Sequence, residues 1–262
     1  MSETGTITLK TAEEIALIRQ ADLIVAGVLD LLRRNIRPGL STMQLDRMAE
    51  EYCRDHGGIP AFKGYYDFPC SLCVSINEEV VHGIPSRKRI LRAGDIVSLD
   101  FGAVFQGFYG DAAITVSVGD TSARKDALMR VTEEALYKGI EQARIGNRVS
   151  DISSAVQTHA EAAGFSVVRQ YVGHGVGTHL HEAPEVPNYV DSRSKSSPRL
   201  QEGMVIAIEP MINMGTHQVK VLDNGWTVVT ADRLPSAHFE HSVAITANGP
   251  YILSQLGGAS GS

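Results

Sequence analysis

The sequence predicts an α/β (α+β) fold in which one domain contains two related halves. Segments with helical periodicity and capping residues alternate with β-branched, strand-like segments. The glycines that end the predicted helices recur at a constant spacing, and a strand that closes on a carboxylate occurs twice. Repetition at a fixed interval is the signature of an internal duplication. We therefore expect a single domain over residues 1–262, with pseudo-symmetric halves at roughly 10–122 and 123–253.

The first half is expected to begin with two amphipathic helices. Each starts with a capping box, in which a hydroxyl residue is followed three positions later by Glu or Gln. Each also ends at glycine, the first near residues 38–39 and the second near residues 57–58. The two capping pairs are Thr11 with Glu14 and Ser41 with Gln44.

A hairpin follows and places two carboxylates in apolar strand sequence. Residues 94–118 carry β-branched and aromatic residues on both sides of a Gln-Gly pair at 106–107, which is typical of a two-residue turn. That turn puts Asp100 and Asp111 on one face of the hairpin, where two buried carboxylates would repel each other and require a cation. A solvated hairpin is the alternative. The expected pairs are Phe105 with Phe108, Asp100 with Ala113, and Asp111 with Gly102.

The second half repeats this plan. Helices are predicted from about residue 124 to 145 and from residue 151 to 164. The strand opening at residues 91–100 recurs at 200–209, so a glutamate, Glu209, takes the place of Asp100. Glu240, before a predicted strand at 242–246, takes the place of Asp111, and four carboxylates argue against the solvated hairpin. The interval is 107 residues for both glycine pairs, Gly39 with Gly146 and Gly57 with Gly164.

Four carboxylates carry four negative charges, which two divalent cations would balance. Oxygen ligands with one imidazole favour Mn²⁺, Fe²⁺ or Co²⁺, and Zn²⁺ remains open. Two such ions hold a bridging water of lowered pKa, which is a nucleophile for hydrolysis. His174 is the candidate imidazole ligand, because a glycine-rich loop lets the backbone approach a ligand closely. Five other histidines lack such a context and are interpreted as structural: His56, His159, His217, His238 and His241.

Composition excludes several other classes of protein. A net charge of −6 and a pI near 5.8 argue against a nucleic-acid substrate. The first residues form no apolar signal segment and no stretch is apolar enough to span a membrane, so we expect a cytoplasmic protein. Three cysteines fit free thiols in a reducing compartment, and the pair at residues 70 and 73 lacks the partners of a zinc site.

Five ordered motifs between about residues 10 and 253 resemble the methionine aminopeptidases in their short bacterial type I form. The resemblance implies the pita-bread fold, with two pseudo-twofold-related halves around a di-metal site. It also implies hydrolytic removal of the initiator methionine from nascent polypeptides whose second residue is small. A monomer in transient contact with ribosomes is the expected form. The motifs are HGIP at His82, SLDFG with FYGD at Asp100 and Asp111, GHGVGTHLHEAP at His174, AIEPMI at Glu209 and FEHSVAIT at Glu240.

The resemblance also implies a role for each matching residue. His181 would donate to the substrate carbonyl oxygen, and His82 would contact the scissile amide. Glu209 would carry a proton from the attacking water to the departing amine. Two divalent ions would be bound, each Co²⁺, Mn²⁺, Fe²⁺ or Zn²⁺. Asp100 would bind one ion, His174 and Glu209 would bind the other, and Asp111 and Glu240 would bridge both.

A methionine side chain requires an apolar, aromatic-rimmed pocket with a soft sulfur contact. By position the lining would be Tyr65, Phe68, Cys73 and Trp226, the single tryptophan. The chain departs from commoner sequences of this kind at Phe62, where a smaller residue is frequent, and at Leu180, where an aromatic residue or Met is frequent. The shape of the pocket rim is therefore left open.

Two rival functions remain. An Xaa-Pro aminopeptidase or prolidase shares the fold and metal ligands, but usually has an additional N-terminal domain and a proline pocket. A non-catalytic binding protein on the same scaffold would have lost its ligands, whereas all five ligand positions are present here.

Overall fold

The computed structural model describes residues 5–190 and 197–257. Four helices account for most of its helical residues: α1 (Ala12–Asn35), α2 (Thr42–Asp55), α3 (Ala123–Gln142) and α4 (Val149–Ala162), with a short 3₁₀ turn, η1 (Tyr65–Asp67). The strands of the first half are β1 (Ile59–Pro60), β2 (Cys73–Ile76), β3 (Glu79–Val81), β4 (Ile96–Phe105) and β5 (Phe108–Ser117). Those of the second half are β6 (Ser166–Val167), β7 (Gly173–Gly175), β8 (Glu182–Val186), β9 (Val205–Ile208), β10 (Met211–Asn213), β11 (Val219–Val221), β12 (Val228–Thr230), β13 (Ser236–His238), β14 (Glu240–Thr246) and β15 (Gly249–Ile252).

Both predicted capping boxes are confirmed. Thr11 and Ser41 each accept a hydrogen bond from the backbone three residues on, and Glu14 and Gln44 each return one to the cap. The first helix ends earlier than expected, because Ile36 already has an extended backbone (φ −64°, ψ 130°). The four helices agree with the predicted ranges to within a few residues.

One curved sheet carries the site. Its strand order is β1-β4-β5-β14-β9-β7-β8, with β2 added beside β4 and β15 beside β14. The hairpin register is confirmed: Phe105 pairs with Phe108, Asp100 with Ala113 and Gly102 with Asp111. Small antiparallel sheets, β13-β10-β6 and β11-β12-β3, pack beside it.

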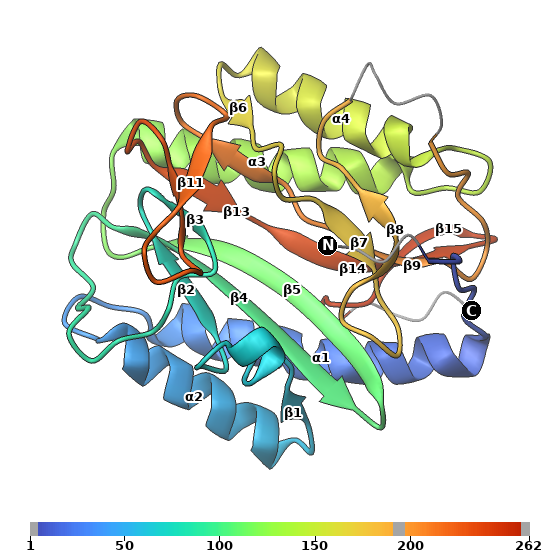
Figure 1. Cartoon of the computed structure of the whole chain (residues 1–262), viewed down its shortest axis with the longest axis horizontal. Helices are drawn as coiled ribbons and strands as arrows, with labels where there is room; N and C mark the ends of the chain where they lie inside the picture. The colour runs from blue at the N-terminus through green and yellow to red at the C-terminus, as the bar shows by residue number, and fades with distance from the viewer. Residues whose placement is uncertain (1–4, 191–196, 258–262) are drawn as a thin grey trace.

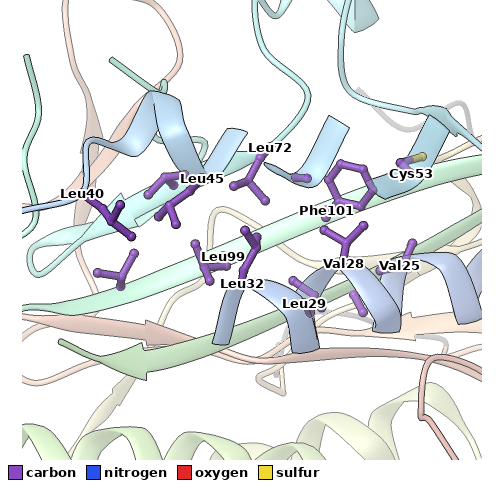
Figure 2. Close-up of a cluster of buried hydrophobic side chains, with 14 of the residues drawn as sticks. Val25, Val28, Leu29, Leu32, Leu40, Leu45, Cys53, Leu72, Leu99 and Phe101 are labelled. Carbon is purple, nitrogen blue, oxygen red and sulfur yellow. The ribbon is translucent and has the colours of Figure 1, made fainter. Parts of the chain in front are cut away.

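The helices flank this sheet as two pairs (Figure 1). In that view α1 and α2 run below the β4–β5 ribbon, and α3 and α4 run above the strands of the second half. Alternate strand residues such as Leu99 and Phe101 point to α1 and α2, where they are fully buried among Val28, Leu32 and Leu45 (Figure 2). The residues between them, including Asp100, therefore face the other side of the sheet.

Within the part of the chain that the structure describes, none of the helices has the length and hydrophobicity of a membrane span.

Candidate metal centre

A row of side chains crosses the sheet on the face opposite the helices. Directly paired residues of neighbouring strands point to the same face. Asp100 on β4 pairs with Cys73 on β2 and with Ala113 on β5, and Ala113 pairs with Glu240 on β14. His241 pairs with Ile208, so the register continued by one residue sets Glu240 against Glu209. Residues on or next to five strands, β2, β4, β5, β14 and β9, are thus brought into one row by strand pairing.

The carboxylates and one imidazole form a compact cluster on this row. Ligand atoms of Asp111, His174 and Glu240 all lie within 4.8 Å of one another, and all three residues are buried. His174 Nε2 lies 4.0 Å from Asp111 Oδ2 and 3.5 Å from Glu209 Oε1. Among the described residues, Asp100 Oδ1, Asp111 Oδ1 and Glu240 Oε1 are buried oxygens without a hydrogen-bond partner.

His174 lies on a strand rather than on the loop that its glycines predicted, and that expectation was wrong. Gly173 and Gly175 are required by close strand packing: a Cβ would come within 2.3 Å of Ala207 O at position 173 and within 2.3 Å of Ala183 O at position 175. His174 Nδ1 lies 2.9 Å from Gly175 O. Nδ1 therefore donates to that carbonyl, which leaves the Nε2 lone pair facing the carboxylates, the arrangement of a metal-binding imidazole.

The pKa values of the cluster's carboxylates are raised, because burial and mutual repulsion disfavour their charged forms. Burial raises the pKa of Asp100 to about 7. Burial and the neighbouring carboxylates raise the pKa values of Asp111, Glu209 and Glu240 well above their ordinary range. Burial lowers the pKa of His174 to about 3, so its imidazole is neutral at neutral pH. Carboxylates that need a cation to stay charged, crowded around a neutral imidazole, are the donor set of a divalent cation site.

His181 lies beside this cluster. Its ring centroid is 4.3 Å from that of His174, and its Nδ1 is 2.9 Å from the hydroxyl of Tyr65. Burial lowers the pKa of His181 to about 4 and raises that of Tyr65 to about 12, so both side chains are neutral at neutral pH. Tyr65 can donate to Nδ1 and thereby leave an N–H on Nε2 of His181.

His82 follows β3 in a left-handed backbone conformation (φ 59°), which is rare for a residue with a side chain. The Thr227 hydroxyl donates to His82 O at 3.4 Å. Gly83 packs so closely that a Cβ there would lie 2.1 Å from Val74 O. The ring contacts Tyr171 and Trp226 edge-on, with centroids 5.6 and 6.3 Å away. Strain of this kind is often found at functional sites.

The predicted pocket residues form one hydrophobic cluster. Phe68 packs against Trp226 edge to face, with ring centroids 5.1 Å apart. Cys73 belongs to this cluster and also pairs with Asp100, so the cluster adjoins the carboxylates. Leu180, one of the two departures noted above, is 2% exposed within it. The cluster contains Phe62, Tyr65, Phe68, Cys73, Leu180 and Trp226, together with Cys70 and several partly buried neighbours.

Sequence reasoning missed two residues at the site. Asp22 on α1 is fully buried and accepts a hydrogen bond from the backbone N–H of Asp111 at 3.0 Å. His238, interpreted as structural, places its Nε2 3.7 Å from Glu209 Oε2. An aspartate within an apolar helical stretch was a signal for the first. His238 had the weaker signal of lying two residues before Glu240.

The fold and the cluster of carboxylates and imidazoles together define a metal-dependent peptidase. Residues 16–247 match metallopeptidase family M24. Methionine aminopeptidase from Clostridium perfringens is 53% identical over 250 residues, which are 95% of this chain and 99% of that protein. Methionine aminopeptidase 1 from Bacillus subtilis is 50% identical over 95% of this chain and 100% of its own length. The chain belongs to the methionine aminopeptidases of family M24.

Solved structures agree with this assignment. Methionine aminopeptidase from Thermotoga maritima superposes with a TM-score of 0.92 at 45% identity, covering 95% of this chain and all of that one. The prolidase from Pyrococcus furiosus, at 24% identity and a TM-score of 0.73 over 65% of its length, shows the shared fold alone. The chain therefore has the pita-bread fold, and it is a hydrolase that binds divalent metal.

Proposed function

We propose that this protein removes the N-terminal methionine from nascent polypeptides whose second residue is small. The apolar cluster of Phe62, Phe68 and Trp226, which adjoins the carboxylates through Cys73, carries the proposal. Such a pocket suits an unbranched thioether side chain, and its sulfur contacts aromatic rings favourably. The relatives named methionine aminopeptidase support the same substrate.

Two divalent ions per chain fit the cluster. Asp100 would hold one ion, His174 and Glu209 the other, and Asp111 and Glu240 both. Co²⁺, Mn²⁺, Fe²⁺ and Zn²⁺ all accept this mixture of carboxylates and imidazole. The unpartnered buried oxygens of Asp100, Asp111 and Glu240 are the observation that supports this ligand set. When bound, the ions would supply Lewis acidity and an activated water.

The chain's own residues would bind the substrate and move its protons. His181, with Nδ1 occupied by Tyr65, would donate its Nε2–H to the carbonyl oxygen of the scissile bond. His82, whose carbonyl accepts from Thr227 and whose backbone is left-handed, would contact the scissile amide. Glu209 would accept the proton of the attacking water and pass it to the departing amine.

A comparison of two peptides tests the substrate assignment. The enzyme purified without oxygen, then loaded with Mn²⁺, Fe²⁺, Co²⁺ or Zn²⁺, should cleave Met-Ala-Ser and leave Ala-Pro-Ala intact. The reverse preference would identify an Xaa-Pro aminopeptidase, and inactivity with every metal would favour a non-catalytic binding protein.

The proposal also covers the domain organisation, oligomeric state, cellular location and ribosome contact of the enzyme. We expect a single catalytic domain of two duplicated halves, a monomer, in the cytoplasm, with transient ribosome contact. Size-exclusion chromatography with light scattering tests the oligomeric state, and co-sedimentation with translating ribosomes tests the contact.

A further inference from the structure

His238 is a buried imidazole without a conventional partner. It is 1% exposed, and neither ring nitrogen has a hydrogen bond among the described residues. An imidazole that leaves its N–H unpaired in the protein interior is costly, because water has been lost and nothing replaces it. The side chain therefore requires an acceptor within reach.

The backbone of His238 is held firmly enough to aim its side chain. His238 pairs with Met211 across β13 and β10. The Thr115 hydroxyl accepts from His238 N at 2.9 Å and donates to His238 O at 2.7 Å. Ser98 in turn contacts the Thr115 hydroxyl at 2.8 Å. These contacts join β13 to the β4–β5 hairpin and fix the position of the His238 backbone, from which the imidazole extends.

Glu209 is the acceptor that this side chain faces. Its Oε2 lies 3.7 Å from His238 Nε2, and its Oε1 lies 3.5 Å from His174 Nε2. The two imidazoles are not equivalent, because His174 uses Nδ1–H on Gly175 O and presents a lone pair to the carboxylate. Of these two imidazoles, His238 is the one whose N–H is available to Glu209.

We propose that His238 is a positioning residue for Glu209, donating Nε2–H to Oε2 so that Oε1 faces His174 and the metal position. The distance of 3.7 Å is longer than a hydrogen bond, but the terminal torsion of a glutamate is soft and a small rotation closes the gap. The inference rests on the proposed role of Glu209 as metal ligand and proton carrier. It adds a residue that prepares this carboxylate for both tasks.

Three substitutions separate donation from simple packing. In His238→Gln the amide nitrogen takes the place of Nε2 and keeps the donor, in His238→Asn the amide sits nearer the Nδ1 position, and in His238→Leu the donor is lost. On Met-Ala-Ser we expect kcat to fall about 10- to 100-fold for Leu and Asn, as for other partners of metal ligands, and to recover to within about threefold for Gln. KM should change little in all three.

Metal binding gives a readout independent of turnover. A Co²⁺ titration followed by visible absorption should show about tenfold weaker binding in His238→Leu and a return towards the wild-type spectrum in His238→Gln. His159→Gln and His159→Leu, on α4, are matched controls and should match the wild type. Circular dichroism and thermal melting verify folding. If the Leu variant does not fold, the comparison of the Gln and Asn variants tests whether a donor at the Nε2 position is required.

Equal kcat values and Co²⁺ spectra for the Gln and Asn variants, or for Gln and Leu, would overturn the proposal. Loss of one whole Co²⁺ equivalent in every variant would also overturn it, because His238 would then be a ligand. A wild-type enzyme that binds Co²⁺ but does not cleave methionine peptides would refute the proposed function alone. The Co²⁺ spectra of the His238 variants would still test the positioning role.

Discussion

Side chains hold Asp111 through both its backbone N–H and its backbone carbonyl. The carboxylate of Asp111 faces His174. Its backbone N–H donates to Asp22, and its backbone carbonyl accepts from the Ser242 hydroxyl at 2.9 Å. The pairing of β14 with β5 ends at His241 and Ala112, one residue short of Asp111. The two side-chain hydrogen bonds take the place of strand pairing at that point. The bridging position proposed for Asp111 therefore has a rigid foundation.

Asp111→Ala should abolish metal binding at one or both proposed positions and nearly all activity, because the proposed ligand set shares Asp111 between the two ions. Isothermal titration calorimetry with Mn²⁺ measures the stoichiometry. Asp120→Ala, at an exposed aspartate, is the control. Unchanged stoichiometry in Asp111→Ala would refute the ligand assignment.

His181→Ala should behave differently. It should retain the metal content of the wild type and lose about 10²- to 10³-fold in kcat, as expected when one donor to a developing oxyanion is removed. Steady-state kinetics on Met-Ala-Ser together with metal analysis checks this. A large loss of metal affinity would show that His181 is itself a ligand.

At the scale of elements, a buried ion pair joins the N-terminal segment to the histidine-bearing loop. Lys10 Nζ donates to Glu182 Oε2 at 2.6 Å and to Thr8 O at 3.0 Å. Glu182 Oε1 accepts from His179 N at 3.1 Å. The pair thus fixes the turn before His181, and Gly177 leaves room for it, since a Cβ there would lie 2.5 Å from Glu182 Oε1.

Lys10→Met should lower the free energy of unfolding by about 3–5 kcal/mol, because Glu182 keeps a largely buried charge without its cationic partner. Denaturant unfolding measures this loss, and the double variant Lys10→Met with Glu182→Gln should recover part of it. Hydrogen exchange at residues 177–181 should accelerate in the single variant. Lys220→Met, at an exposed lysine, is the control, and equal effects of the two lysine changes would contradict the pairing argument.

A second link ties α2 to the segment that carries the pocket aromatics. Glu50 accepts from Lys63 Nζ at 2.8 Å and from the Ser71 hydroxyl at 2.9 Å, on either side of Tyr65 and Phe68. The hydrogen bond from Lys63, followed by those from Arg54 and Ser71, lowers the pKa of Glu50 from 4.5 to about 2. A lowered folded-state pKa contributes stability above the unfolded value and loses it as the pH falls through the folded value.

Glu50→Gln should therefore melt a few degrees below the wild type at pH 7, with the difference shrinking between pH 4.5 and about 2. Differential scanning calorimetry across this range measures it. Glu51→Gln, at the exposed neighbouring glutamate, should show no such trend. A difference that stays constant down to pH 2 would contradict the ionic origin.

At the scale of the whole molecule, the site lies where both halves of the chain meet. Asp100 and Asp111 come from the β4–β5 hairpin, whereas His174, Glu209 and Glu240 come from the second half. A divalent ion bound there would connect the halves and neutralise carboxylates that burial disfavours as anions. Metal binding should consequently stabilise the whole fold.

Mn²⁺ at 100 times its Kd should add about 2.7 kcal/mol to the free energy of unfolding. For a chain of this size the melting temperature should rise by roughly 5–10 °C. Scanning calorimetry before and after chelation measures the rise, which should be absent in Asp111→Ala. Equal melting temperatures with and without metal would show that a bound ion does not stabilise the fold, and would contradict a metal site between the two halves.

Local features of this protein were readable from residues near one another in the chain. The capping boxes depend on residues three positions apart, and the hairpin register follows from a two-residue turn, so both were predicted correctly. The motifs around His174, Glu209 and Glu240 likewise marked the candidate ligands. The helix ends and the strand at His174 were less accurate, because packing against other strands sets them.

The neighbours of Asp22 and His238 depend on contacts between distant segments. Asp22 reaches Asp111 because α1 packs on β5, and His238 reaches Glu209 because Thr115 ties β13 to the central hairpin. Neither contact leaves a pattern in the sequence, since both arise from burial and from the order of strands in the sheet. Sequence alone marked the candidate metal ligands, whereas packing established which side chains surround and orient them.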